Sequence, residues 1–227
     1  MKSLPIVAIM FVLIGVACHN AKEGKMNNGP GIYADYKING EEGRDSVTCV
    51  FQFKRSRNSP KSYVLEDGSV QLDGEPLQPD SAAFTGAYYE VQKPLQSFEG
   101  KHTITFTDDN GNKHTVTFDF TPLSLKTELP ETIKRQDIAL QLNGTKSDEA
   151  IRVVMIDTSF GTRDINELET VKDGTVVISK QQLKAVANGP VTLQLIKEEE
   201  LPLINPTVKG GQIAITYGLS RDFNLKD

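Results

Sequence analysis

The sequence predicts an all-β protein with two tandem β-sandwich domains, and three observations support this fold class. After residue 31, apolar and polar residues alternate with a period of two through most of the chain, as is typical of half-buried strands. Turns rich in Gly, Asn and Asp separate these runs at short intervals. The roughly 210 residues that follow the leader are enough for two small domains.

The first domain is expected over residues 32–124, because the apolar runs in this part alternate like strands. Its strands are predicted at residues 32–38, 47–53, 63–65, 70–72, 88–91, 102–106 and 114–120. In the second of these strands, Cys49 alternates onto the same face as Val47 and Phe51. We expect Cys49 to be a small buried core residue, the alternative being a reactive thiol. Short antiparallel strands with turns at this spacing are most simply an immunoglobulin-like sandwich.

The last two strands of this domain allow a prediction of their register. Matching the core faces of both strands pairs Ile104 with Phe118. The same register pairs Phe106 with Val116 and leaves a three-residue loop around Gly111. A loop of that length needs one residue in left-handed geometry, which we expect at Gly111.

The second domain is expected over residues 125–227. Its strands are predicted at residues 138–142, 151–156, 175–178, 191–196 and 212–217. One helix interrupts them, because Ser179 and Gln182 have the spacing of a capping box and the Asn-Gly-Pro sequence at 188–190 ends the helical stretch. This domain is therefore also predicted to be an immunoglobulin-like or related sandwich, with one short helix.

A short leader stands in front of these domains. Lys2 is followed by an apolar run of roughly 13 residues, which suits a signal peptide, whereas a membrane-spanning helix needs about 20. The run ends in Gly15-Val16-Ala17-Cys18, which resembles the lipobox of bacterial lipoproteins. In that family the small residues precede a cysteine that receives a diacylglyceryl group and becomes the mature N-terminus.

The lipobox resemblance implies a cleaved signal peptide over residues 1–17, a lipid on Cys18 and a flexible tether over residues 18–31, which are rich in Lys, Asn and Gly. Two alternatives remain at this point. Ordinary signal peptidase would also accept the small residues before Cys18 and would leave its thiol free, and an uncleaved leader would act as an anchor. The residues from 209 to 225 are likewise similar to the endings of uncharacterised bacterial lipoproteins with sandwich domains. The expected location is the cell envelope, at the outer membrane.

Charge and cysteine content limit the classes of partner. The formal net charge of −5 argues against nucleic acid, because phosphate binding needs a basic face. The chain contains two cysteines, so a lipid on Cys18 would leave Cys49 without a disulfide partner. The expected partners are the membrane, reached through the lipid, and a protein of the envelope.

No catalytic motif is found, and we expect no catalytic residue, no metal ligand and no cofactor. The sequence contains no nucleophile elbow, zinc-protease helix or phosphate-binding loop. His19 lies in the tether, and we expect His102 and His114 to be structural because they lie at opposite ends of one hairpin. The Asp- and Asn-rich tip at 108–112 suggests calcium, but a hairpin turn requires the same residue types.

Two groups of residues are candidates for binding. One is a loop containing Phe160, Arg163 and Asp164 between two strands, although Phe160 packed onto the core would be an ordinary structural loop. The other is the pair Tyr88 and Tyr89, which must face opposite ways on a strand, so that one ring is free to stack on a sugar. The absence of Trp from the chain counts against glycan binding, and ordinary packing is the alternative.

These observations favour a lipid-anchored, non-enzymatic envelope protein that binds a partner or serves as a scaffold. The alternative is a protein that binds an envelope polymer or glycan. A hydrolase is a distant third hypothesis, because no catalytic constellation supports it.

Overall fold

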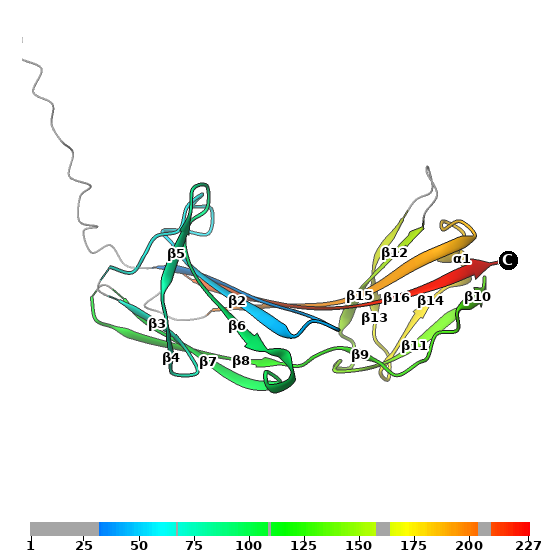
Figure 1. Cartoon of the computed structure of the whole chain (residues 1–227), viewed down its shortest axis with the longest axis horizontal. Helices are drawn as coiled ribbons and strands as arrows, with labels where there is room; N and C mark the ends of the chain where they lie inside the picture. The colour runs from blue at the N-terminus through cyan, green and yellow to red at the C-terminus, as the bar shows by residue number, and fades with distance from the viewer. Residues whose placement is uncertain (1–31, 67, 109, 158–163, 204–209) are drawn as a thin grey trace, which may run out of the picture.

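The chain folds into an elongated molecule with two β-sandwich lobes, which lie side by side along the horizontal axis of Figure 1. The computed structural model describes residues 32–66, 68–108, 110–157, 164–203 and 210–227. Nearly all regular structure in these residues is strand, with one α-helix, α1 (Lys180–Leu183). The predicted all-β class with two β-sandwiches is confirmed.

Eight strands and one 3-10 turn belong to the first lobe alone. They are β1 (Tyr33–Glu41), β2 (Ser46–Lys54), β3 (Ser69–Leu72), β4 (Glu75–Leu77), β5 (Pro79–Ala82), β6 (Gly86–Pro94), η1 (Leu95–Ser97), β7 (Gly100–Thr107) and β8 (Lys113–Phe120). The second lobe has β9 (Ser124–Leu125), β10 (Thr132–Lys134), β11 (Ile138–Asn143), β12 (Ala150–Asp157), β13 (Ile165–Thr170) and β14 (Thr175–Ile178). Two long strands, β15 (Gly189–Pro202) and β16 (Gly211–Lys226), run through both lobes (Figure 1).

One nine-stranded sheet extends along the whole molecule. Its order is β13-β12-β15-β16-β1-β2-β6-β5, with β10 also paired to β16. A four-stranded sheet, β4-β3-β7-β8, completes the first sandwich, and a three-stranded sheet, β14-β11-β9, completes the second. The core lies between the long sheet and each of these smaller sheets.

The final strand, β16, is shared by the two lobes. One edge pairs antiparallel with β15 over residues 212–225. The other edge pairs in parallel with β1 over residues 211–218 and then with β10 over residues 224–226. β1 of the first lobe and β10 of the second therefore lie beside the same last strand, so that β16 completes the sheet of the first sandwich as well as that of the second. The domain limits 32–124 and 125–227 stay a prediction, and β16 crosses between them.

The alternation read from the sequence is confirmed where it is strongest. In β2, Val47, Cys49, Phe51 and Phe53 are all fully buried, and the residues between them are partly exposed. Burial raises the pKa of the Cys49 thiol to about 12, so the thiolate that would react is absent at neutral pH. Cys49 is thus the small core residue that was expected.

One predicted strand is absent and two are longer than expected. Residues 63–65 form no strand, and β3 pairs with β4 and β7. The strands predicted at 191–196 and 212–217 continue to Pro202 and Lys226, because charged residues beyond the apolar runs keep the strand conformation.

The short helix begins as the sequence predicts. The Ser179 side chain accepts a hydrogen bond from the Gln182 N–H at 3.3 Å, and the Gln182 side-chain oxygen accepts one from the Ser179 N–H at 2.8 Å. Leu183 is fully buried beneath it. No helix in the described part of the chain has the length and apolar character needed to cross a membrane.

The register predicted for the β7–β8 hairpin is wrong by two residues. Ile104 pairs with Val116, and Phe106 pairs with His114, so that the connection spans residues 108–112 instead of three residues. A shift by two keeps every side chain on its face, so alternation alone cannot distinguish the two registers. Gly111 has φ of +82°, as the expected left-handed geometry requires.

The Asp108 side chain selects the observed register. Its Oδ1 accepts hydrogen bonds from the N–H groups of Asn110 and Asn112, both at 2.9 Å. Its Oδ2 lies 3.0 Å from Nε2 of His114, whose ring stacks on Phe106. Burial alone would raise the pKa of Asp108, but the bonds from His114, Asn112 and Asn110 together hold that pKa below its ordinary value.

We expect Asp108→Asn to lower the free energy of unfolding at neutral pH by about 2 kcal/mol, because His114 then has no carboxylate Oδ2 as its hydrogen-bond acceptor. A carboxylate with a lowered pKa stabilises the folded state above its ordinary pKa of 3.8, and this contribution is lost as the pH falls through the folded value. The loss of stability below pH 4 should therefore be smaller in the variant. Urea unfolding across this pH range measures both effects. Asp119→Asn, at an exposed position of β8, is the control, and equal losses in the two variants would contradict this role for Asp108.

Candidate functional site

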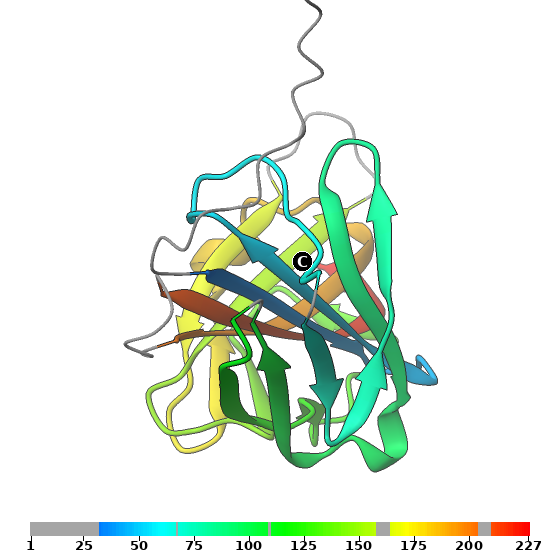
Figure 2. The same cartoon turned by 90° about the vertical axis from the view of Figure 1, so that its left-hand side faces the viewer.

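The β5–β6 arm, defined as residues 79–94, is a hairpin at one edge of the long sheet. Its outer strand, β5, is exposed at all four positions. In Figure 1 the arm rises above the sheet at the upper left, and Figure 2 shows its blue-green strands standing at the right of the first lobe. Edge strands that project from a sandwich are well placed to contact a partner.

The turn of the arm is fixed to the body of the lobe by Ser62. The Ser62 N–H and hydroxyl both donate to the Thr85 carbonyl, at 3.0 and 2.8 Å, and the hydroxyl also lies in hydrogen-bond reach of the Ala87 carbonyl. Gly86 has φ of +83°, and a Cβ at this position would lie 2.2 Å from the Ser62 carbonyl oxygen. Only glycine fits this close approach, so the turn is held in one place.

Phe84 lies at the tip of this fixed turn. Its side chain is 90% exposed, the largest value among the exposed large apolar residues of the described chain. The neighbouring residues from Ala82 to Thr85 are also exposed. A large aromatic side chain that remains in water on an ordered turn is unusual for a monomer and is typical of a contact residue.

Tyr88 and Tyr89 face opposite ways on β6, as the sequence predicts. Tyr89 is buried in the core, and its hydroxyl accepts a hydrogen bond from the Leu65 N–H at 3.2 Å. Tyr88 lies on the outer face and donates to Oδ2 of Asp80 at 3.0 Å, directly across the strand pair. The hydrogen bond to Asp80 and the charge of that carboxylate raise the pKa of Tyr88. The Tyr88 ring is therefore oriented but still partly exposed.

An open hollow of about 480 Å³ lies beside Tyr88. The side chains around it include Gln78, Pro79, Asp80, Glu90 and Gln92. They offer one aromatic ring, two carboxylates and two amides, and none of the described residues that line the hollow carries a positive charge. This volume lies within the range of small-molecule sites.

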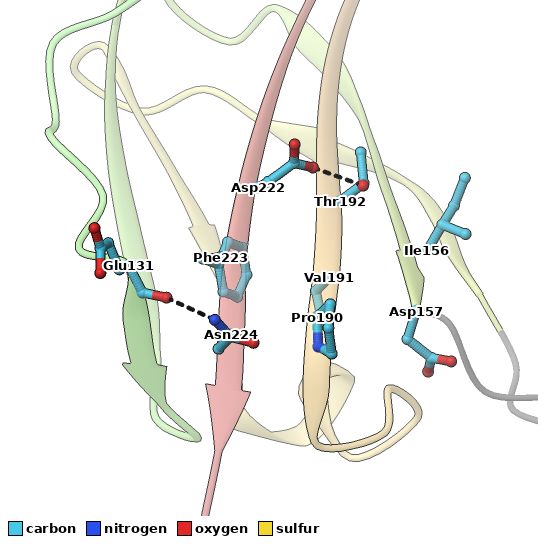
Figure 3. Close-up of a pocket in the computed structure, with 9 residues that line it drawn as sticks. All are labelled: Glu131, Ile156, Asp157, Pro190, Val191, Thr192, Asp222, Phe223 and Asn224. Carbon is cyan, nitrogen blue, oxygen red and sulfur yellow. Dashed lines mark hydrogen bonds between the residues drawn. The ribbon is translucent and has the colours of Figure 1, made fainter.

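A second open hollow, of about 600 Å³, lies on the other lobe where β12 and β16 end and β15 begins (Figure 3). Two of its carboxylates are engaged: Asp222 accepts a hydrogen bond from the Thr192 hydroxyl at 2.7 Å, and Asp157 accepts one from the Ala187 N–H at 2.7 Å. Ile156 is exposed beside them. The sequence did not single out these residues.

The predicted binding loop is described only at its end. Asp164 is exposed immediately before β13, whereas Phe160 and Arg163 lie outside the described residues. Cys18, the signal peptide over 1–17 and the tether over 18–31 also lie outside them. The role of this loop and of Cys18 therefore stays a prediction.

The two described histidines each have a structural partner. His102 Nδ1 lies 2.7 Å from Oδ2 of Asp73, its Nε2 lies 2.9 Å from the Phe98 carbonyl, and its ring stacks on Phe98. His114 lies against Asp108 in the other turn of the same sheet. Within the ranges that the structure describes, no group of three or more His, Cys, Asp or Glu side chains is arranged to hold a metal ion.

The sequence pattern did not indicate Phe84, the most exposed large apolar residue of the described chain. The available signal was a single aromatic residue two positions before a turn glycine, in a stretch that otherwise resembles a polar loop. A lone loop aromatic usually packs on the core, and only the position of the turn shows that this one does not.

No protein-family model and no characterised protein sequence matches the chain. Among solved structures, it is similar to the first two immunoglobulin domains of DIP-gamma, with 12% identity over 84% of this chain and 98% of that one, at a TM-score of 0.24. It is also similar to murine CEACAM1b, with 11% identity, coverage of 85% and 98%, and a TM-score of 0.22. A Bacteroides ovatus glucan-utilization protein, SGBP-B, solved with a mixed-linkage heptasaccharide, matches at 13% identity over 82% of this chain and 60% of that one, at a TM-score of 0.20. At these TM-scores the likenesses carry no argument about function.

Proposed function

We propose that this chain is a non-enzymatic binding protein of the cell envelope, anchored by a lipid on Cys18, that holds a partner protein with the tip of its β5–β6 arm. The observation that carries the proposal is the 90% exposed side chain of Phe84 on a turn fixed by Ser62. Because the turn is already ordered, little conformational entropy is lost when a partner covers the ring. Aromatic residues of this kind are enriched in protein interfaces.

The expected contribution of Phe84 can be estimated from its area. Burying a Phe side chain stabilises a complex by about 1.5 to 3 kcal/mol relative to leaving it in water. Each 1.4 kcal/mol changes the dissociation constant by about tenfold. Phe84→Ala should therefore weaken the complex by about 10- to 100-fold.

Capture of partners from intact envelopes by the purified chain tests this proposal. We expect the wild type to retain one protein in stoichiometric amount, and Phe84→Ala to lose it. Leu168→Ala is the matched control, because Leu168 is an exposed apolar residue of β13 in the other lobe. Equal recovery by all three chains, or turnover of an ester, peptide or glycoside at ordinary enzyme rates, would overturn the proposal.

Cys18→Ser tests the anchor separately. Two or three acyl chains anchor a protein stably because each buried CH₂ contributes about 0.8 kcal/mol. We expect the wild type to incorporate a fatty-acid probe and to sediment with membranes, and the variant to do neither. Cys49→Ser is the control for labelling, because Cys49 is buried in the core. Labelling of the Cys18→Ser chain would contradict the anchor.

A further inference from the structure

We infer that the hollow beside Tyr88, together with a row of uncharged polar side chains across the long sheet, is a binding site for a neutral glycan chain. The inference rests on the proposal that the chain binds rather than catalyses, and it concerns a different surface from the Phe84 tip. Five strands contribute to it: β5, β6, β2, β1 and β16.

The hollow itself has the chemistry of a sugar site. A half-exposed ring such as that of Tyr88 stacks on the apolar face of a pyranose, and its hydrogen bond to Asp80 fixes the ring orientation. Glu90 and Asp80 provide carboxylate acceptors, and the amides of Gln78 and Gln92 both donate and accept. Sugar hydroxyls need such mixed partners. The carboxylates of Asp80 and Glu90 would repel a phosphate or a uronic acid, because no basic residue is present among the described residues that line the hollow.

A polar row continues from the hollow across the sheet. Gln92 pairs with Thr48, Thr48 pairs with Asn39, and Asn39 pairs with Thr216, each on the neighbouring strand. Thr48, Asn39 and Thr216 alternate with buried core positions and so lie on the outer face, and Gln92 lies on the same face because it pairs with Thr48. None of the four is charged, and none is bulky.

The length of this row favours a chain of sugar units over a single ring. Neighbouring strands lie about 4.8 Å apart, so the three steps from Gln92 to Thr216 cover about 14 Å. The row ends where Glu198, the β15 partner of Thr216, is paired with Arg152 at 2.9 Å. A charged pair at that end and the Tyr88 ring at the other set the limits of the proposed site.

Native affinity electrophoresis with soluble neutral polysaccharides tests the inference, using a glucan, a mannan and a xylan, with a polyuronate as the acidic comparison. We expect at least one neutral polymer to retard the wild-type chain, with little change at high salt, and the polyuronate to have no effect. Tyr88→Ala should weaken retardation at least about tenfold, and Asn39→Ala several-fold. Tyr88→Phe keeps the stacking ring and should retain most of the binding.

Phe84→Ala distinguishes this site from the proposed protein contact. It should leave retardation by the polysaccharide unchanged, whereas Tyr88→Ala should leave capture of the protein partner unchanged. Retardation that is lost at high salt, or that survives in Tyr88→Ala, overturns the glycan site. If none of the three neutral polymers retards the wild-type chain, the glycan site is also overturned. That result would leave the proposed protein contact at Phe84 standing. Thermal unfolding of each variant confirms that it is folded.

Discussion

A fragment of residues 32–124, expressed alone, should show no cooperative unfolding transition. It contains every strand of the first lobe except the shared pair, β15 and β16, and so it leaves the whole β1 edge without its parallel partner. It also loses Ile213, Ile215 and Tyr217 from the core. Burial of these three side chains contributes about 6 kcal/mol, which is comparable to the total stability of a small domain.

The packing of Tyr217 shows why this loss cannot be absorbed locally. Its ring lies edge-on to Phe120 at 6.0 Å between centroids. It also covers Gly40, where an added Cβ would lie 2.8 Å from the ring. Without β16, the Phe120 ring and the core face of β1 would be exposed to water.

Circular dichroism and thermal unfolding of the fragment measure this effect. Co-expression with residues 125–227 is the complementary experiment, since the second fragment carries β16. We expect the two fragments to purify as a complex that melts cooperatively. A fragment 32–124 that melts cooperatively by itself, within a few degrees of the full chain, would show that the first lobe does not depend on β16.

Gly144→Ala should lower the free energy of unfolding by about 3 kcal/mol or more. Gly144 has φ of +79°, and a Cβ there would lie 2.0 Å from the Pro122 carbonyl oxygen. Left-handed backbone costs a non-glycine residue about 1 to 2 kcal/mol, and overpacking adds about 1 to 3 kcal/mol. The Gly144 carbonyl also accepts a hydrogen bond at 2.7 Å from Nζ of Lys197, which is buried, so movement of this turn would disturb that ion as well.

Gly111→Ala is the matched control for this prediction. Its φ of +82° is nearly the same, but nothing lies within 4 Å of the position of its Cβ. Only the backbone cost applies, and we expect a loss of about 1 kcal/mol. Urea unfolding of both variants measures the difference, and equal losses would show that the close approach of Gly144 to Pro122 relaxes at no cost.

The arm was predictable only in part. The opposite orientation of Tyr88 and Tyr89 follows from strand alternation, and it is observed. The exposure of Phe84 does not follow from any local pattern, because it depends on Ser62, a residue from another loop, holding the turn away from the core. The polar row across the sheet likewise depends on which strands become neighbours.

Charged residues explain why the length of β15 and β16 was underestimated. Lys197, Glu199 and Arg221 occupy inward positions of these strands, where the sequence pattern expects apolar residues. Each has a partner near the junction of the lobes: Lys197 donates to Gly144, Glu199 pairs with Lys146 at 3.0 Å, and Arg221 pairs with Glu42. These partners are distant in sequence, so β15 seemed to end where its inward positions stopped being apolar.

Local sequence is enough to predict the all-β class, the buried face of β2, the capped helix and the left-handed Gly111. Each of these depends on the period of the side chains or on the backbone preferences of a few adjacent residues. Local sequence does not set the register of the β7–β8 hairpin, the sharing of β16 between the lobes or the exposure of Phe84. Registers that differ by two residues bury the same faces, and a strand can pair on either edge, so contacts between distant residues must select among arrangements that are locally equivalent.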